Sequence, residues 1–190
     1  MKFYSSTHEF AYSWEEVSTG NWLKYCPWND KSTHVIGVDT LSRRLDPTTH
    51  ILRTERLITC RQSAPKWLRS IFGSDETSLV YEISYVDARA KKVTMCSQNM
   101  TWNDLLSVQE TVTYRPSLAN AGCTRFEQTA KIIALCGGWQ KIKNGIEDFT
   151  VERFRQNAAK GREGFERVLA MSREVFAEQR EQARREKMGL

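Results

Sequence analysis

The sequence predicts an α+β fold in which an antiparallel sheet of about seven strands is covered by one long helix. Apolar residues alternate in one segment at Leu79, Tyr81, Ile83 and Tyr85, and in another at Val108, Val112 and Tyr114. A period of two is typical of strands that bury one face. Short turns at 88–91 and 103–105 favour antiparallel pairing. After Gly138, apolar residues recur every three to four positions, which is typical of an amphipathic helix.

The N-terminal region predicts one strand followed by one helix. Residues 2–9 can form the strand. Ser13 is a good helix N-cap, and Glu15 and Glu16 fall in the first turn, where carboxylates suit the helix dipole. Pro27 is expected to end this helix.

Six more strands are expected in the middle of the chain. The Asp46-Pro47 pair is a turn signal between the first two of them. Their expected ranges are 33–45, 49–62, 76–87, 92–102, 106–115 and 123–136. The order of elements is therefore strand, helix, six strands and helix.

The C-terminal region, from Gly137 onward, predicts either one long helix or two helices with a bend near Gly161. The domain is expected to span 1–176, with a charged helical tail at 177–190. A twisted sheet wrapped on a helix tends to enclose a cavity. Glu110 and Gln128 share strand faces with apolar residues, so they either line this cavity or lie at a rim that contacts water.

The loop at 63–74, SAPKWLRSIFGS, is longer and more apolar than a typical hairpin loop. It has two interpretations: a short helix packed on the edge of the core, or a lid that touches a membrane, where aromatic and basic residues suit the lipid interface. The candidate lid residues are Pro65, Lys66, Trp67, Leu68, Arg69, Ile71 and Phe72.

Composition and motifs exclude several classes of protein. The net charge of +5 favours an anionic partner without specifying nucleic acid, and the uninterrupted apolar runs are far shorter than the roughly 20 residues that cross a bilayer. The N-terminus does not resemble a cleaved leader. The five cysteines and three histidines are dispersed, which argues against a zinc site or a disulfide framework.

Motifs for catalysis and nucleotide binding are missing from the sequence, so we expect neither an enzyme nor a cofactor or metal. Glu147 and Asp148 form a carboxylate pair, but helix neighbours point about 100° apart and do not share a site. We expect salt bridges from this pair. A nucleic-acid binder is also disfavoured, because the aromatic residues alternate into strand interiors instead of forming a stacking platform.

Five segments resemble the PRELI/MSF1 domain family, in its slowmo-like branch that includes the fungal Ups proteins. The likeness extends from Met1 to about Val175. The segments are THVIGVDTLSRRL (33–45), RTERLITCRQSAPKW (53–67), EISYVD (82–87), SVQETVTYRP (107–116) and EDFTVERFRQNAAKGREGF (147–165).

The resemblance implies a concave sheet closed by helices, similar to the START and phosphatidylinositol-transfer folds, around a lipid cavity. It implies transfer of one phospholipid, phosphatidylserine, between the mitochondrial outer and inner membranes. The lipid would be cargo and not a cofactor. A small helical twin-Cx9C protein of the intermembrane space would be the partner, and the carrier would bind anionic membranes peripherally. The alternatives are a phosphatidic acid carrier and a membrane-associated adaptor without transfer activity.

Family positions that contact the head group can be carried over residue by residue. Two of them correspond here to Lys24 and His34, although a histidine at the start of a strand equally suits ordinary hydrogen bonding. Where the family residue is missing, the candidate cations are Arg61, Lys143 and Arg153. The resemblance also makes the 63–74 loop the lid of the cavity.

The chain departs from the family pattern at two places. Phosphatidic acid carriers show two lysines where this chain has Thr59 and Cys60, which favours phosphatidylserine. A basic residue is expected at position 145, where the chain has Gly145, and Lys143 is the nearest cation. Arg153 and Lys160, one or more turns later, are alternatives, and Lys160 suits a solvated basic helix face better than a head-group site.

Overall fold

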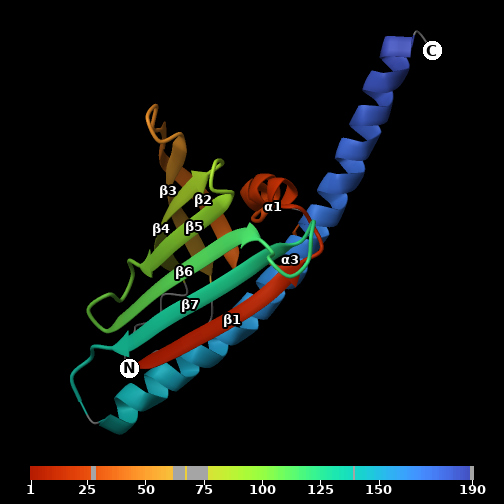
Figure 1. Cartoon of the computed structure of the whole chain (residues 1–190). Coiled ribbons are helices and arrows are strands. Elements are labelled where there is room, and N and C mark those ends of the chain that lie inside the picture. Colours follow the sequence, from red (N-terminus) through yellow and green to blue (C-terminus); the bar gives the residue numbers. More distant parts are fainter. Residues whose placement is uncertain (27–28, 62–66, 68–76, 139, 189–190) are drawn as a thin grey trace.

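The computed structural model describes residues 1–26, 29–61, 67, 77–138 and 140–188. Within them, an antiparallel sheet packs against one long helix, as predicted (Figure 1). The strands are β1 (Lys2–Phe10), β2 (Val35–Leu45), β3 (Ile51–Arg61), β4 (Thr77–Asp87), β5 (Lys92–Asn99), β6 (Leu106–Pro116) and β7 (Thr124–Ala134). The helices are α1 (Trp14–Gly20), the 3₁₀ helix η1 (Asn21–Leu23) and α3 (Gln140–Met188).

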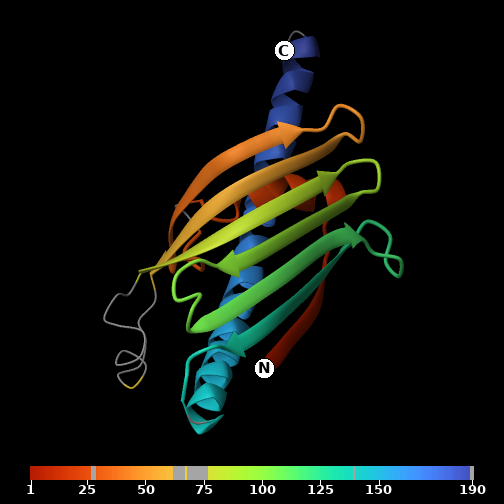
Figure 2. The ribbon, with the colours of Figure 1, turned by 90° about the vertical axis from the view of Figure 1, so that its left-hand side faces the viewer.

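Across the sheet the strand order is β1-β7-β6-β5-β4-β3-β2, and each adjacent pair is antiparallel. From β2 to β7 the chain therefore advances one strand at a time, and β1 pairs with β7 at the far edge. The sheet stays open, with β1 and β2 as its edges. Figure 2 shows the twisted sheet in front of α3, which crosses the strands obliquely on one face.

An aromatic cluster fixes α3 to the sheet. Phe10 of β1, Tyr114 of β6 and Phe165 of α3 are each about 1 % exposed. The Phe10 and Phe165 ring centroids are 5.4 Å apart, and Phe126 of β7 lies 5.3 Å from Tyr114. Edge-to-face and tilted pairs of this kind add to the free energy gained by burial. The cluster therefore joins the sheet and α3 in one hydrophobic core.

Helix α1 begins as predicted and ends earlier than predicted. The Ser13 hydroxyl accepts a hydrogen bond from the backbone N–H of Glu16, and the Glu16 carboxylate accepts one from the backbone N–H of Ser13. The helix expected to reach Pro27 ends at Gly20 and continues as η1. An ideal Cβ at Gly20 would lie 2.8 Å from Leu169 Cδ2, so the chain passes very close to α3 at this point.

Helix α3 is continuous through Gly161, so the alternative of two helices is not realised. Gly164 serves close packing: an ideal Cβ there would lie 2.5 Å from Asn29 Oδ1. The C-terminal end of α3 projects beyond the sheet (Figure 1). No helix in the described ranges is long and apolar enough to cross a membrane.

The expected strand at β4 is present, but its predicted buried face is wrong. Glu82 and Ser84 are buried, whereas Tyr85, on the face expected to be buried, is 38 % exposed. On that outer face the Tyr81 hydroxyl donates a hydrogen bond to Glu55. The inner face tolerates Glu82 because a cation on the neighbouring strand pairs with it.

Candidate functional site

A cavity of ≈ 330 Å³ lies between the inner face of the sheet and α3. Its walls are mainly apolar, with side chains from strands on one side and from the helix on the other. Apolar residues that line it include Val35, Ile58, Val80, Met95, Leu106, Val108, Val112, Phe149, Phe154 and Phe165. A cavity with apolar walls and a few polar groups is typical of small-molecule and lipid binding.

Basic side chains gather at this cavity. Lys24, His34 and Arg153 all line it. Burial and the positive charges of Lys24, Lys160 and Arg153 hold the pKa of His34 below its ordinary value. Burial also lowers the pKa of Arg153, whose guanidinium lies 4.9 Å from the Phe149 ring centroid. Because these cations disfavour one another, an anionic group placed among them would be stabilised.

Two of the predicted head-group residues lie elsewhere. Arg61 is exposed at the end of β3, and its backbone N–H donates to the His34 carbonyl at 2.7 Å. Lys143 is half-buried in the first turns of α3. Neither side chain is among those that line the cavity. The structure therefore brings together Lys24, His34 and Arg153, and leaves Arg61 and Lys143 outside this group.

Trp67 is the one candidate lid residue that lies in the described part of the chain. The other candidate lid residues lie outside the described part of the chain: Pro65, Lys66, Leu68, Arg69, Ile71 and Phe72. The Trp67 ring packs edge-on against Phe149, with centroids 6.4 Å apart. It also lies 3.7 Å from an ideal Cβ at Gly145. Gly145, where the family resemblance predicts a basic residue, therefore leaves room for this ring at the cavity wall.

A row of polar side chains runs across the inner face of five adjacent strands, from β3 to β7. Arg56 pairs with Glu82, Glu82 with Ser97, and Ser97 with Glu110 in the strand register. Ser97 Oγ donates to Glu110 Oε2 at 2.9 Å, and Gln128 Nε2 donates to Glu110 Oε1 at 2.6 Å. Glu82, Ser97, Glu110 and Gln128 line the cavity. The row gives an otherwise apolar cavity a polar floor.

Sequence reasoning found part of this row. Glu110 and Gln128 were candidates for the cavity or its rim, and they lie in the cavity. Arg56, Glu82 and Ser97 were missed. Their signal in the sequence is a polar residue that shares a strand face with buried residues, as Arg56 does with Thr54 and Ile58.

Aromatic rings cover the basic end of the row. The Arg56 guanidinium lies 5.5 Å from the Trp22 ring centroid and 5.9 Å from that of Tyr25. Burial, reinforced by the charge of Glu82, raises the pKa of Tyr25 above its ordinary value. Burial likewise raises the pKa of Cys60 to about 11. Neutral Tyr25 and Cys60 side chains therefore border the cavity at physiological pH.

The carboxylate pair of α3 forms salt bridges, as predicted. Glu147 is buried and accepts hydrogen bonds from the Met1 amino group at 2.6 Å and the Ala134 backbone N–H at 3.0 Å. Asp148 pairs with Lys2 at 2.7 Å. Both carboxylates thus bind the start of β1 and the end of β7 to α3. The residues that the structure describes contain no group of three or more His, Cys, Asp or Glu side chains that could hold a metal ion.

An open antiparallel sheet wrapped on a C-terminal helix, with a cavity between them, defines a START-like fold. The crystal structure of a START superfamily protein from Mycobacterium smegmatis matches with a TM-score of 0.50 and 16 % identity, over 89 % of this chain and 98 % of that one. The protein TTHA0849 from Thermus thermophilus matches with a TM-score of 0.59 and 14 % identity, over 90 % of this chain and 99 % of that one. At these identities the likeness concerns the fold alone.

The chain belongs to the PRELI-like family, whose family model matches residues 15–175. It is 45 % identical to the protein "UPS2, mitochondrial" of Saccharomyces cerevisiae over 179 residues, 94 % of this chain and 75 % of the relative. It is 43 % identical to the UPS-like protein C36.10 of Schizosaccharomyces pombe over 89 % of each chain. A slowmo homologue of Dictyostelium discoideum is 34 % identical over 88 % of this chain and 71 % of the relative. These relatives agree with the Ups and slowmo branch.

Proposed function

We propose that the protein carries one phospholipid between membranes without chemical change, and that phosphatidylserine is its preferred cargo. The observation that carries this proposal is the grouping of Lys24, His34 and Arg153 on a cavity with apolar walls. Such a site matches the two chemical parts of a phospholipid. The acyl chains would occupy the apolar walls, and the phosphate would lie near the cations.

The physical need for such a carrier follows from the acyl chains. Exposing them to water costs about 0.8 kcal/mol for each CH₂ group, so a diacyl lipid leaves a bilayer very slowly without help. A protein cavity replaces the aqueous intermediate. It must open at a membrane and close in water, which is the role we propose for the 63–74 loop. The packing of Trp67 on Phe149 supports this role, because Phe149 lines the cavity.

The proposed location and partner rest on the family. A relative is named as mitochondrial, and we propose that this chain acts in the mitochondrial intermembrane space, bound peripherally to anionic membranes. The basic chain, with a net charge of +5, suits such surfaces, where each cation contributes about 1 kcal/mol. We propose a small helical twin-Cx9C protein as its partner. Thr59 and Cys60, in place of two lysines, favour phosphatidylserine over phosphatidic acid.

A vesicle assay tests the proposal. The purified full chain, alone and with its partner, is mixed with donor vesicles containing acyl-labelled phosphatidylserine or phosphatidylcholine and with unlabelled acceptor vesicles. Faster transfer of phosphatidylserine is expected. No transfer above the blank with partner alone would favour a membrane-associated adaptor. Faster transfer of phosphatidic acid than of phosphatidylserine would favour the alternative cargo.

Charge reversal at the cavity tests the site itself. Lys24→Glu is expected to reduce extraction of anionic lipid, because it places a carboxylate beside the phosphate. Lys131→Glu is the matched control, since Lys131 is exposed and lies between the inward-facing Ala130 and Ile132. Equal extraction by the two variants would remove Lys24 from the site.

A further inference from the structure

Glu110 lines the cavity and forms no ion pair among the residues the structure describes. Arg162 lines the same cavity, but its guanidinium donates to Ser6, which lies opposite Gln128 in the strand register. The contrast with Glu82, two strands away on the same row, is direct. Glu82 is paired with Arg56 Nη2 at 2.5 Å. The hydrogen-bond donors to Glu110 are neutral: the Ser97 hydroxyl and the Gln128 amide. A carboxylate offers about four acceptor positions, so two donors leave Glu110 able to accept more hydrogen bonds.

Gln128 points to the same missing group. Its side chain is only 8 % exposed, yet its Oε1 atom has no hydrogen-bond partner. Buried polar atoms are normally paired, and an unpaired one calls for a ligand or water. Gln128 Oε1 and the free positions of Glu110 are both acceptors. A group that satisfies them must therefore donate several hydrogen bonds, and one with a positive charge would also balance the carboxylate.

We propose that Glu110 and Gln128 form a subsite for the ammonium group of an amine-bearing phospholipid head group. Phosphatidylserine and phosphatidylethanolamine both carry this group. The inference rests on the proposed function and deepens it, because it assigns the amine of the cargo to named residues. Phosphatidic acid has no ammonium and would leave the subsite empty.

The subsite and the cations Lys24, His34 and Arg153 line the same cavity, which is the geometric basis for their binding one head group. Burial raises the pKa of Tyr114 to about 12, the charge of Lys24 opposes this rise, and that of Glu110 adds to it. Lys24, Tyr114 and Glu110 all line this cavity. A phosphate at Lys24 and an ammonium at Glu110 would match a head group that carries both charges.

Entry of the lipid strengthens the preference for an amine-bearing head group. Acyl chains displace water from the cavity, and a carboxylate without water or a cation is then strongly destabilised. An ammonium group restores the balance through charge-assisted hydrogen bonds. A lipid without an amine leaves the Glu110 carboxylate without an ion-pair partner. The carboxylate therefore favours amine-bearing lipids and also disfavours the others.

The test compares wild type with Glu110→Gln, which keeps the shape and removes the charge. Transfer of acyl-labelled phosphatidylserine, phosphatidylethanolamine and phosphatidic acid is measured between phosphatidylcholine vesicles. We expect the transfer rate of the amine-bearing lipids to fall about tenfold in the variant, relative to that of phosphatidic acid. This is the effect of one hydrogen bond to a charged group. The wild-type rates for the two amine-bearing lipids identify which head group is the cargo. Glu127→Gln is the matched control, because Glu127 pairs with Arg115 and Arg125 on the outer face.

A change of ligand tests the same contact without a mutation. N-acetylated phosphatidylserine keeps the phosphate and carboxylate and loses the ammonium. Wild type should discriminate against it about tenfold, and Glu110→Gln should not. An equal loss of transfer for all lipids in Glu110→Gln, or no loss for any of them, would overturn the subsite.

A binding measurement separates failure of the subsite from failure of the carrier function. Native mass spectrometry of the full chain titrated with short-chain phosphatidylserine or phosphatidic acid does not depend on transfer. If wild type moves no lipid between vesicles, the carrier proposal fails. Selective loss of phosphatidylserine binding in Glu110→Gln would still support the subsite, and equal binding of both lipids by both proteins would overturn it.

Discussion

Arg56 donates two hydrogen bonds to a single oxygen of Glu82, from Nε at 2.9 Å and from Nη2 at 2.5 Å. The two side chains are 4 % and 5 % exposed and belong to the adjacent strands β3 and β4. A buried pair of this kind adds little net stability compared with apolar residues, but breaking it is costly. The pair therefore contributes more to the polarity of the cavity floor than to the stability of the fold.

Removing one member of this pair should destabilise the domain. We expect Arg56→Met to lower the free energy of unfolding by about 3–5 kcal/mol, because Glu82 is left buried without a cation. Denaturant unfolding followed by circular dichroism measures this loss. The double variant Arg56→Met, Glu82→Leu should recover most of it, since neither charge remains. A double variant as unstable as the single one would contradict this explanation.

Two glycines of α3 should respond in opposite directions to the same substitution. At Gly164 an added Cβ would lie 2.5 Å from Asn29 Oδ1 and 2.8 Å from Lys31 Cβ, and Asn29 is buried. Gly164→Ala should therefore destabilise by about 1–3 kcal/mol. At Gly161 nothing lies within 4 Å, so Gly161→Ala should stabilise by about 0.5–1 kcal/mol. Thermal unfolding distinguishes them, and equal shifts for both would show that helix propensity alone decides.

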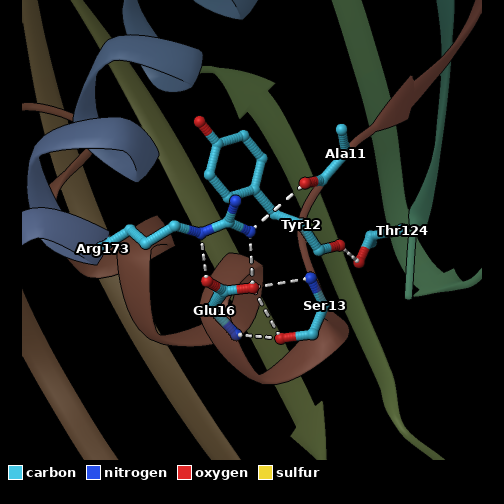
Figure 3. A network of polar contacts seen from close by, with 6 residues as sticks. All are labelled: Ala11, Tyr12, Ser13, Glu16, Thr124 and Arg173. Atoms are coloured by element: carbon cyan, nitrogen blue, oxygen red, sulfur yellow. Dashed lines mark hydrogen bonds and ion pairs between the residues drawn. The ribbon is translucent and has the colours of Figure 1, made fainter. Parts of the chain in front are cut away.

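The contact between α1 and α3 should depend on pH. Arg173 pairs with both carboxylate oxygens of Glu16 and donates to the Ala11 carbonyl (Figure 3). The Arg173 guanidinium is the largest cause that lowers the pKa of Glu16 from 4.5 to about 2. A lowered pKa adds stability above pH 4.5, and this contribution is lost as the pH falls from 4.5 toward 2.

Arg173→Gln is therefore expected to cost about 0.5–1 kcal/mol near pH 7, a modest amount because the pair is partly exposed. The difference from wild type should disappear as the pH approaches 2. Unfolding curves across this range provide the measurement. Arg185→Gln is the control, because its pair with Glu181 lies on the projecting end of α3. A penalty for Arg173→Gln that stays constant with pH would exclude Glu16 as the cause.

Substitution of Trp67 tests the lid. Trp67 is 47 % exposed and contacts α3 at Phe149 and Gly145. Trp67→Ala should reduce phospholipid transfer several-fold while the unfolding temperature stays close to that of wild type, because nearly half of the side chain is already exposed to solvent. Leu118→Ala, at a fully exposed position (100 %), should leave transfer unchanged. Unfolding of the Trp67 variant would instead support a short helix packed on the core edge.

Most elements of the fold were predictable because hydrophobic period and turn chemistry are local properties. Ser13 and Glu16 mark the start of α1, and the long period-3.6 pattern marks α3. The end of α1 at Gly20 was not predictable, since it depends on the approach of Leu169 from the far end of the chain. Gly161 is compatible with either a bend or a continuous helix, and only packing decides between them.

The site was partly predictable for a related reason. Period two shows which residues share a face, but not which face is inside. In β4 the apolar set suggests burial of Tyr81 and Ile83, whereas the cavity side holds Glu82, whose partner Arg56 comes from another strand. The family likeness pointed to Lys24, His34 and Arg153, which all line the cavity. It could not show that the polar row, with Glu110, lines the same cavity.

The pairing of β1 with β7 has a consequence for how the chain folds. Lys2 lies opposite Ile132, so the first strand has no partner until most of the chain has been made. Helix α3 follows later still, and until it arrives the apolar inner face is open to water. Contacts so distant in sequence form slowly, and exposed apolar faces aggregate. The newly made chain therefore exposes an aggregation-prone face until its last third is present.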